Sequence, residues 1–416
     1  MNLGKRLSLI GCSMVMLLAG SQAAAAAGAA QPATTIVLDG YPLPFPVSPE
    51  IVRGTTMVPF RAIAEALQIS VSWDNKTHTI TADKTSGGSK KQVLLKQNSK
   101  TAFVDGRSVQ LPVAPMARSG SILVPLSFFG SQFGAKTSWD GAARTVSIVS
   151  PAAEMYTEAF YALASFDEHE LIDRFDSVSF GWASIGGDGK LTVKGKDYYW
   201  PQPAGDVTPE SLVTDAAKGG TAPQLMVVAK DGSGELTKLL GDASLQQQAV
   251  QDMVNLAAES GFAGITLDFE GLGLTGDKTA VQKSYNAFVR LVGSRAKAAG
   301  LKLSLALHPL NGSYQGYDYK TLAGYADELI IMAYGYSYEK GPEPLNRVDE
   351  AIRLALQQAP KNKLVLGISM GSENAQTVDA KIGLAKRYGL KGIALWRLGL
   401  IGDDAMKRIG NAVVLD

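Results

Sequence analysis

One stretch decides the fold of this chain: Gly264-Ile265-Thr266-Leu267-Asp268-Phe269-Glu270-Gly271. It has the apolar character of a buried strand and runs out into two acids. Side chains alternate between the two faces of a strand, so we expect Thr266, Asp268 and Glu270 on the same face. Two acids side by side repel each other, and one is driven toward its protonated form. Such a pair holds a proton near neutral pH, as general acid catalysis requires.

The sequence around this stretch has a regular rhythm. From about residue 155 onward, short apolar strands alternate with helical segments, which is typical of parallel β/α architecture. We predict eight strands, at residues 160–166, 177–183, 224–229, 264–269, 302–307, 328–334, 363–369 and 392–396, with helices that include 245–260, 278–299 and 349–358. This pattern predicts a (β/α)8 TIM barrel, whose active site lies at the carboxyl ends of the strands. The residues expected at those ends are Asp268, Glu270, His308, Tyr334, Met370 and Trp396.

The front of the chain, residues 34–150, contains an internal repeat. Three short motifs recur 66 positions later: Leu38-Asp39-Gly40 as Val104-Asp105-Gly106, Met57-Val58-Pro59-Phe60 as Leu123-Val124-Pro125-Leu126, and Ser72-Trp73-Asp74 as Ser138-Trp139-Asp140. Constant spacing indicates a duplicated α+β unit. In each unit we expect strands around an Asp-Gly turn, a helix after Val-Pro, and a hairpin. We expect residues 84–91 to form a polar loop between the units.

The repeated unit resembles the copper amine oxidase N-terminal-like stalk domain of secreted bacterial surface proteins. Two interpretations stay open: attachment to the cell wall or cell surface, and a spacer that only carries the barrel. The chain has three histidines, His78, His169 and His308, and they form no sequence cluster suited to copper. We therefore expect no metal and no cofactor.

The barrel region resembles glycoside hydrolase family 18, which includes chitinases and the spore-cortex and peptidoglycan N-acetylglucosaminidases. Residues 262–270 are similar to that family's catalytic strand, Met332-Ala333-Tyr334 to its Met-x-Tyr strand, and Trp396 to the tryptophan of its last strand. The three motifs occur in the family's order on predicted strands four, six and eight. The resemblance implies a glycosidase that cleaves β-1,4-linked N-acetylglucosamine in a polysaccharide, with peptidoglycan ahead of chitin.

The resemblance also implies a role for each matching residue. Glu270 would be the general acid and then the base, Asp268 would orient the substrate's acetamido N–H, and Tyr334 would donate a hydrogen bond to the acetamido oxygen. Trp396 would form the floor under the sugar. The further candidate substrate-binding residues are Met332, Trp182 and Tyr336, although for the last two ordinary packing is at least as good an interpretation. For His308, a structural or supporting role is favoured over a catalytic one.

The sequence departs from the family pattern at three positions, and at one of them Gly335 follows Tyr334 where many chitinases have Asp. Ala263 and Thr266 occupy the positions of the first two aspartates, which weakens the usual cycling of Asp268 between two partners. Reduced motifs of this kind resemble the spore-germination and cell-wall branch. The alternative hypothesis is therefore a catalytically weak glycan-binding protein of the cell wall.

The N-terminal residues and the overall composition bear on location and partners. Residues 1–27 have the charged start, apolar core and alanine run of a secretory signal peptide, with a lipid anchor at Cys12 as a weaker alternative. No later stretch is apolar enough for a transmembrane helix in the mature chain. The formal net charge of +1 favours no nucleic-acid partner. We expect a secreted protein with a stalk at 34–150 and a barrel at 155–416.

Overall fold

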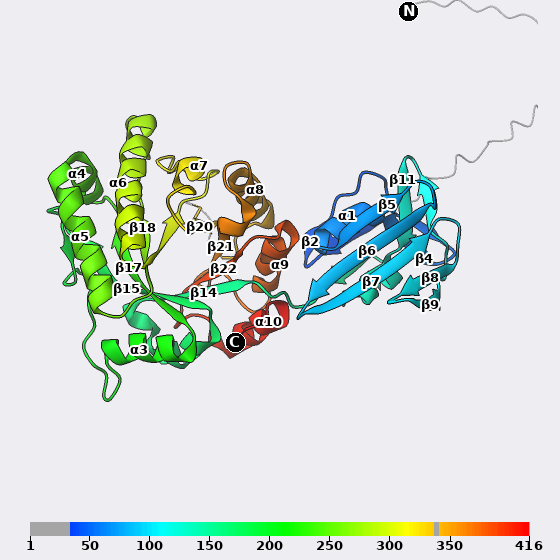
Figure 1. The fold of residues 1–416 in the computed structure, drawn as a ribbon, viewed down its shortest axis with the longest axis horizontal. Coiled ribbons are helices and arrows are strands. Elements are labelled where there is room, and N and C mark those ends of the chain that lie inside the picture. The colour runs from blue at the N-terminus through cyan, green and yellow to red at the C-terminus, as the bar shows by residue number, and fades with distance from the viewer. Residues whose placement is uncertain (1–33, 337–340, 416) are drawn as a thin grey trace, which may run out of the picture. The chain divides into compact units, whose positions relative to one another are not determined.

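The computed structural model describes residues 34–336 and 341–415, drawn in colour in Figure 1. The predicted signal peptide lies outside the described residues. The described chain begins with a β-rich region and continues as an α/β barrel, and each is described here by itself.

The β-rich region contains three antiparallel or mixed sheets and two short helices. Its strands are β1 (Thr35–Leu38), β2 (Tyr41–Pro42), β3 (Glu50–Val52), β4 (Thr55–Pro59), β5 (Ser70–Asp74), β6 (Thr79–Ser86), β7 (Ser89–Lys96), β8 (Thr101–Val104), β9 (Arg107–Gln110), β10 (Met116–Arg118), β11 (Ser121–Pro125), β12 (Lys136–Asp140) and β13 (Thr145–Val149). The helices are α1 (Phe60–Ala66) and α2 (Leu126–Gln132). The sheet orders are β12-β13-β1-β2, β10-β11-β4-β3 and β5-β6-β7-β8-β9.

The two repeats fold alike. Each runs strand, helix and hairpin, as β4-α1-β5-β6 and β11-α2-β12-β13, and β4 pairs with β11 between the copies. Pro59 and Pro125 end the strands and precede the helices, because proline supplies no further N–H to a sheet ladder. One face of each helix is buried. It carries Phe60 and Ile63 in the first copy, and Leu126 and Phe129 in the second.

The prediction of a polar loop at residues 84–91 is wrong. These residues belong to the hairpin of β6 and β7, which pair from Lys84 and Lys91 out to Ser86 and Ser89. Gly87 and Gly88 form the turn with positive φ angles of 52° and 72°. Two glycines between paired strands favour a tight hairpin turn over an open loop, and the polar composition masked that signal.

The barrel is closed by eight parallel strands within the described residues. They are β14 (Tyr156–Tyr161), β15 (Ser177–Ile185), β17 (Ala222–Ala229), β18 (Gly264–Phe269), β19 (Lys302–Leu307), β20 (Glu328–Met332), β21 (Leu364–Ser369) and β22 (Gly392–Trp396). The sheet order is β14-β22-β21-β20-β19-β18-β17-β15, and β14 also pairs with β15. A short antiparallel strand, β16 (Leu191–Thr192), adds to β15. This closure confirms the predicted TIM barrel.

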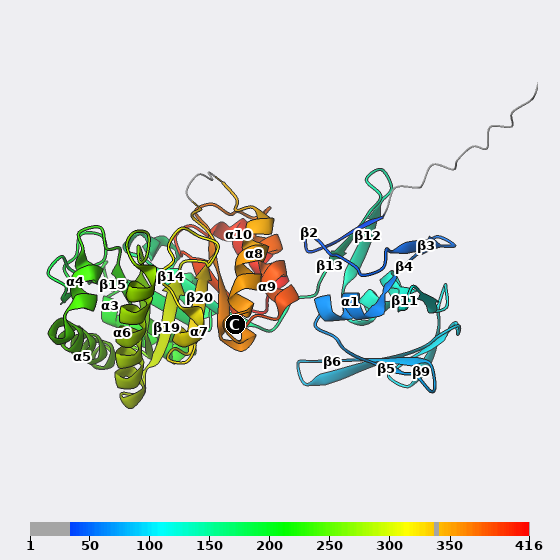
Figure 2. The same ribbon diagram turned by 90° about the horizontal axis from the view of Figure 1, so that it is seen from above.

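Helices cover the outside of the strands (Figures 1 and 2). They are η1 (Leu163–Arg174), α3 (Pro209–Gly219), α4 (Glu235–Gly241), α5 (Ala243–Glu259), α6 (Lys278–Ala298), α7 (Tyr319–Leu322), α8 (Leu345–Leu356), η2 (Lys361–Lys363), α9 (Val378–Tyr388) and α10 (Gly402–Ala412). The first strand begins and ends earlier than predicted, because residues 163–166 belong to the irregular helix η1. No helix of the described chain is long and apolar enough to cross a membrane.

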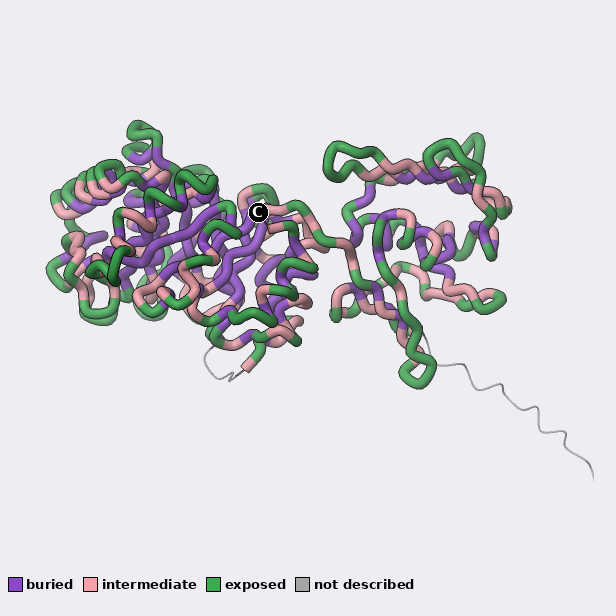
Figure 3. Tube along the Cα trace, turned by 90° about the horizontal axis from the view of Figure 1, so that it is seen from below, coloured by how far each residue is buried: buried purple, intermediate pink, exposed green. Residues whose placement is uncertain are grey.

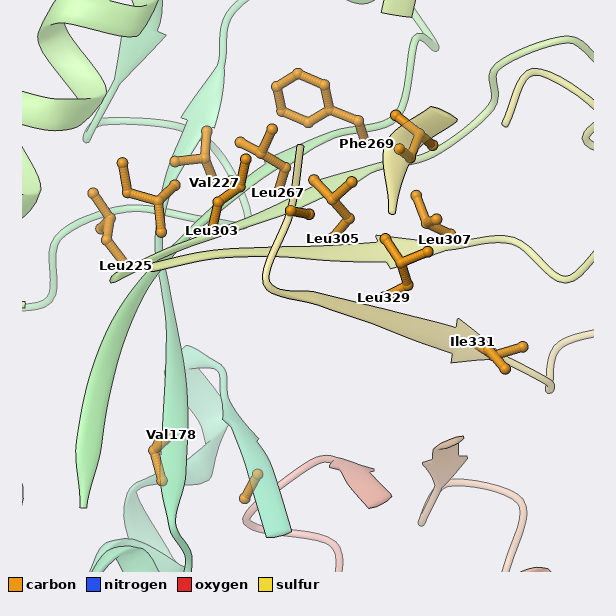
Figure 4. Packing of buried hydrophobic residues seen from close by; sticks show 14 of the residues in the cluster. Val178, Leu225, Val227, Leu267, Phe269, Leu303, Leu305, Leu307, Leu329 and Ile331 are labelled. Atoms are coloured by element: carbon orange, nitrogen blue, oxygen red, sulfur yellow. The ribbon is translucent and has the colours of Figure 1, made fainter. Parts of the chain in front are cut away.

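Strand alternation divides the barrel into two layers. Leu267 and Phe269 gather with Val227 and Leu305 on the helix-facing side of the strands (Figure 4). The opposite faces supply a small apolar cluster inside the barrel, made of Phe160, Met226, Val228, Ile330, Val365 and Ala394. Figure 3 shows the strands as the most buried part of this region. A rigid, buried framework therefore carries the strand ends.

A polar network also lies among the buried residues of the strands. Ser179 donates to Glu158 at 2.6 Å and lies 2.7 Å from the Thr266 hydroxyl. Thr266 and Ser304 both contact the side-chain oxygen of Gln224, at 3.2 and 3.1 Å. Burial and the nearby charge of Glu328 raise the pKa of Glu158 to about 8.

Candidate active site

The two acids of the deciding stretch lie at the carboxyl end of β18. Val228 of β17 pairs with Asp268, and Asp268 pairs in turn with Ala306 of β19. Glu270 follows the last residue of the strand, and its N–H donates to the carbonyl of Ala229 at 2.7 Å. The neighbouring strand ends therefore fix the backbone beneath both carboxyl groups.

Asp268 is almost fully buried, with 4% of its surface exposed. Its Oδ1 atom has no hydrogen-bond partner among the described residues. Burial, and next the charge of Glu270, raise the pKa of Asp268 well above its usual range, while Lys230 opposes the rise. A carboxyl group without donors in a buried site favours its neutral form. The environment of Asp268 therefore opposes its ionisation.

Glu270 is more open and has two basic neighbours. Its Oε1 atom lies 3.8 Å from the ammonium of Lys230, and its Oε2 atom lies 3.6 Å from Nε2 of His308. The His308 ring stacks on Tyr314 with a centroid distance of 4.2 Å. Burial lowers the pKa of His308 to about 4, so its imidazole is neutral at neutral pH. The sequence placed His308 at a strand end without revealing this contact.

Tyr334 lies close enough to both acids for their charges to act on it. Burial, followed by the charges of Asp268 and Glu270, raises the pKa of Tyr334 well above its usual range. The phenol therefore keeps its proton and can donate it in a hydrogen bond. Gly367 of β21 leaves room for the ring, because a Cβ atom there would lie 3.1 Å from Tyr334 Cε1.

A chain of buried charged groups holds the backbone that follows Tyr334. The Gly335 N–H donates to Glu343 Oε1 at 2.9 Å, and the Glu343 N–H donates to Glu373 Oε1 at 2.8 Å. Lys381 of α9 pairs with Glu373 Oε2 at 3.0 Å. The side chains of Lys381 and Glu373 are 5% and 1% exposed. We call these four residues the Lys381 clamp.

Trp396 ends β22 and is partly buried. Its ring lies 5.4 Å from that of Phe160, at the edge of the apolar cluster inside the barrel. The peptide bond that follows Trp396 is cis. Met332 ends β20 and is 6% exposed, and Met370, directly after β21, is buried as well.

Trp182 and Tyr336 do not present free rings to the cleft. Trp182 is fully buried on the helix-facing side of β15, against Phe180 and Trp200, because alternation gives it the same face as Phe180. Tyr336 donates to Asn311 at 2.9 Å, and the Arg347 guanidinium covers its ring at 4.1 Å. These contacts describe packing, and a role of either residue in sugar binding stays a prediction.

Sequence reasoning missed four residues near the acids, which are Lys230, Tyr198, Tyr285 and Tyr317. Lys230 directly follows β17, and Tyr198 lies close enough to be influenced by the charges of Asp268 and Glu270, which with burial raise the pKa of Tyr198. The position of Lys230 at a strand end was a usable signal. Tyr198 lies in a segment without regular periodicity, which gave none. Within the described residues, no group of three or more His, Cys, Asp or Glu side chains is arranged to hold a metal.

Comparison with protein families gives two matches. Residues 37–148 match the model of the copper amine oxidase N-terminal domain, and residues 137–383 match that of glycosyl hydrolases family 18. The second match covers both acids and Tyr334 and ends before β22.

Curated relatives and solved structures agree with this assignment. The chain is 26% identical over 202 residues to the cortical fragment-lytic enzyme of Bacillus anthracis (42% of this chain, 46% of that protein), and 24% identical over 230 residues to the Bacillus subtilis (strain 168) protein of the same name (39% and 52%). It thus spans about half the length of these relatives.

Two solved structures share the fold. The spore cortex-lytic enzyme SleL of Bacillus megaterium QM B1551 superposes with a TM-score of 0.53 at 17% identity, over 63% of this chain and 75% of that one. A chitinase of Chromobacterium violaceum ATCC 12472 gives 0.53 at 21% identity, over 62% and 98%. With a family match over more than half of its residues and two acids at the matching strand end, this chain belongs to family 18 of the glycosyl hydrolases.

Proposed function

We propose that this protein hydrolyses β-1,4-linked N-acetylglucosamine in a cell-wall polysaccharide, with peptidoglycan ahead of chitin. The observation that carries the proposal is the pair of Asp268 and Glu270 at the carboxyl end of β18, with the neutral phenol of Tyr334 beside it. The curated relatives are named for lysis of cortical fragments, which favours peptidoglycan.

The proposed reaction uses the substrate's own N-acetyl group as the nucleophile, the known exception to the two-carboxylate scheme. Glu270 protonates the glycosidic oxygen as the bond to the sugar breaks, and later takes a proton from the attacking water. Asp268, as a carboxylate, accepts the acetamido N–H and stabilises the positive charge of the cyclic intermediate. Tyr334 donates to the acetamido oxygen, and Trp396 supports the sugar ring.

In the barrel interior, Asp268 has no second aspartate below it on β18. Thr266 takes the position of the family's inner acid, and its hydroxyl is engaged by Ser179 and Gln224. A hydroxyl cannot accept the proton of Asp268 as a carboxylate would. Asp268 therefore lacks the second proton acceptor that the family pattern supplies.

We further propose that the protein is secreted through residues 1–27 and acts at the cell wall or cell surface. The region that matches the copper amine oxidase N-terminal domain would attach the barrel to the wall or act as its spacer. The two roles predict different results, since deletion of residues 34–150 would lower wall binding only in the first.

A glycan-binding protein with little activity is the second candidate. The observation in its favour is Thr266, which takes the position of the family's inner acid and whose hydroxyl is engaged by Ser179 and Gln224. Retention of both acids and of Tyr334 argues for the enzyme.

The test is sugar release from purified peptidoglycan and from N-acetylglucosamine oligomers, with the wild type and Glu270→Gln. Glutamine keeps the shape of the side chain and removes the transferable proton. We expect release by the wild type and a loss of about 10²- to 10⁴-fold in the variant. Glycan binding by both proteins without release by either would support the second candidate and contradict the first.

A further inference from the structure

We propose that Arg397 is a specificity-determining residue: the open edge of its guanidinium, beside Trp396, binds a carboxylate that the polysaccharide substrate carries. The inference rests on the proposed function and deepens it, because it names a group on the substrate that the same cleft would recognise. Peptidoglycan carries carboxylates on its lactyl groups or on its peptide stems, whereas chitin is a neutral polymer. A carboxylate site would therefore give the chain a physical basis for distinguishing the two.

Arg397 lies at the carboxyl end of the barrel strands. It directly follows Trp396, the last residue of β22, and it is partly buried. The strand end itself is fixed, since the Met370 N–H donates to the Trp396 carbonyl at 2.6 Å. Asp268 and Glu270 lie at the same end of the barrel. The guanidinium therefore belongs to the rim of the proposed cleft.

Tyr198 is a common neighbour of Arg397 and the two acids. Burial, and next the charges of Asp268 and Glu270, raise the pKa of Tyr198, and the charge of Arg397 opposes the rise. Charges act on a partly exposed group in this way only from nearby, because solvent and salt screen them. The rings of Tyr198 and Trp396 also pack against the same apolar cluster inside the barrel. Arg397 is thus near the place where a sugar on Trp396 would lie.

One nitrogen of the guanidinium holds the side chain in place. Arg397 Nη1 donates to the carbonyls of Ala164 and Leu398, each at 2.9 Å, and lies 3.4 Å from the Ser165 hydroxyl. Ser165 is fully buried, and its hydroxyl donates to the Leu398 carbonyl at 2.5 Å. The guanidinium is therefore ordered before a ligand arrives, which lowers the entropic cost of binding.

The backbone that follows Arg397 is anchored by a carboxylate of η1. The two oxygens of Glu168 accept from three N–H groups, those of Gly399 at 2.6 Å, Ile401 at 3.2 Å and Gly402 at 2.7 Å. A carboxylate with three backbone donors is well satisfied. Glu168 therefore fixes the segment that carries Arg397 without pairing with the guanidinium.

The remaining edge of the guanidinium is open. Within the described part of the chain, every hydrogen bond of Arg397 goes through Nη1, and the residue forms no ion pair. Nε and Nη2 present two parallel N–H groups, which fit both oxygens of one carboxylate. Lys230, another cation near Tyr198, is already paired with Glu270 at 3.8 Å. Arg397 is thus a cation at this rim whose charge remains available to a substrate.

The kinetics of Arg397→Met on matched substrates test the inference. Three glycans of equal length are compared: a neutral N-acetylglucosamine oligomer, a peptide-free strand with free lactyl carboxylates, and a strand with its peptide stems. We expect kcat/KM to fall about tenfold on a carboxylated strand and less than about twofold on the neutral oligomer. The loss should lie in KM, because a carboxylate away from the breaking bond contributes equally to the ground state and the transition state.

The two carboxylated strands identify the source of the charge. A loss on the peptide-free strand assigns the contact to a lactyl group, and a loss confined to the other strand assigns it to a stem. Arg397→Lys keeps the charge without the two-pronged edge and should restore part of the loss. Arg408→Met is the matched control, since Arg408 is an exposed arginine of α10 whose partner is Asp379 at 3.5 Å. It should leave all three substrates unaffected.

Two outcomes would overturn the inference. If Arg397→Met loses equally on neutral and carboxylated glycans, the arginine serves only to hold the carbonyls of Ala164 and Leu398. If the variant is unchanged on all three substrates, the open edge of the guanidinium binds nothing that matters for turnover.

Binding without turnover separates this inference from the proposed function. Calorimetric titration uses Asp268→Asn, which leaves Lys230 and Glu270 in place. Binding of the carboxylated strand should weaken more than that of the neutral oligomer when NaCl is raised from about 50 mM to about 500 mM. Adding Arg397→Met should remove that difference. Its absence would reject the role of Arg397 even if the chain cleaves glycan, and its presence in a chain whose wild type is inactive would reject only the proposed function.

Discussion

At the scale of single residues, the environment gives two similar acids different tasks. Asp268 and Glu270 are two positions apart, yet one is nearly fully buried and the other lies beside a lysine and a histidine. Desolvation disfavours a charge on the first and raises its pKa. The second is more open to solvent and to a bound ligand.

The first prediction at this scale concerns replacement of Asp268. Asp268→Asn keeps the shape of the side chain but cannot become a carboxylate, so it cannot stabilise the positive charge of the intermediate. We expect kcat to fall by about 10²- to 10³-fold, measured by sugar release. Asp215→Asn, at an exposed position on α3, serves as the control. Full activity in Asp268→Asn would remove Asp268 from the mechanism.

His308 yields a second prediction. Its neutral ring lies beside Glu270. Loss of the ring should therefore let the Glu270 side chain leave its productive position. We expect His308→Ala to lower kcat by about tenfold with little change in KM, because positioning matters most in the transition state. His308→Gln, which can still reach Oε2, should restore part of the loss. A larger effect on KM than on kcat would contradict a positioning role.

The sequence predicted residues of this scale only where periodicity and motif coincide. Asp268, Glu270, Tyr334 and Trp396 stand at strand ends that the alternation of apolar residues reveals. Trp182 illustrates the opposite case, since a tryptophan near a strand end faces either the cleft or the helices. A shift of the strand by one residue turns the side chain from one of these faces to the other.

At the scale of elements, the Lys381 clamp links α9 to the segment that follows β20. The contacts run from the Gly335 N–H through Glu343 and Glu373 to Lys381. The backbone beside Tyr334 is therefore connected to a buried charge on α9. Sequence gave no sign of this connection, because its members are far apart in the chain and none belongs to a motif.

The clamp predicts a strong effect from a distant substitution. Lys381→Met leaves the buried carboxylate of Glu373 without its cation, which should lower the free energy of unfolding by about 3–5 kcal/mol. The midpoint of urea denaturation measures this. The double variant Lys381→Met with Glu373→Gln removes the unpaired charge, and it should recover much of the stability. Equal stability of the wild type and the single variant would contradict the account.

Element boundaries were predicted less well than element types. The first barrel strand ends at Tyr161, before the predicted limit, because residues 163–174 form the irregular helix η1. The region around Gly87 and Gly88 forms a hairpin whose polar strands resemble a loop. In both places the local composition suited two structures, and the chain adopts a helix in the first and a tight hairpin in the second.

At the scale of the whole molecule, closure of the barrel buries polar groups in its interior. One of them, Glu158, makes the free energy of unfolding depend on pH. Glu158 has a pKa of about 8 in the folded protein, against an ordinary value of 4.5. Between these values the folded state binds more protons than the unfolded state. The contribution of Glu158 to the free energy of unfolding should therefore fall as the pH rises from about 4.5 to about 8.

The corresponding prediction concerns Glu158→Gln. Glutamine cannot ionise, so the variant should lose less stability than the wild type when the pH is raised through this window. Denaturation midpoints in urea at pH 5 and pH 8 measure the difference. A variant whose stability changes between the two pH values by the same amount as that of the wild type would show that Glu158 does not titrate in this way.

The barrel as a whole was predictable because eight apolar strands at regular spacing leave few other solutions. The interior network was not, since Ser179, Gln224 and Thr266 look like ordinary polar residues until the strands close around them. Thr266 was recognised as a departure from the family pattern, but its partners became visible only in the folded chain.

The most direct test of the central claim is the configuration of the first sugar released. Proton NMR, recorded within seconds of mixing the enzyme with an N-acetylglucosamine oligomer, distinguishes the two anomers before they interconvert. A reaction through the substrate's N-acetyl group retains configuration, so the account predicts the β anomer as the first product. The α anomer as the first product would mean direct attack by water and would contradict the account.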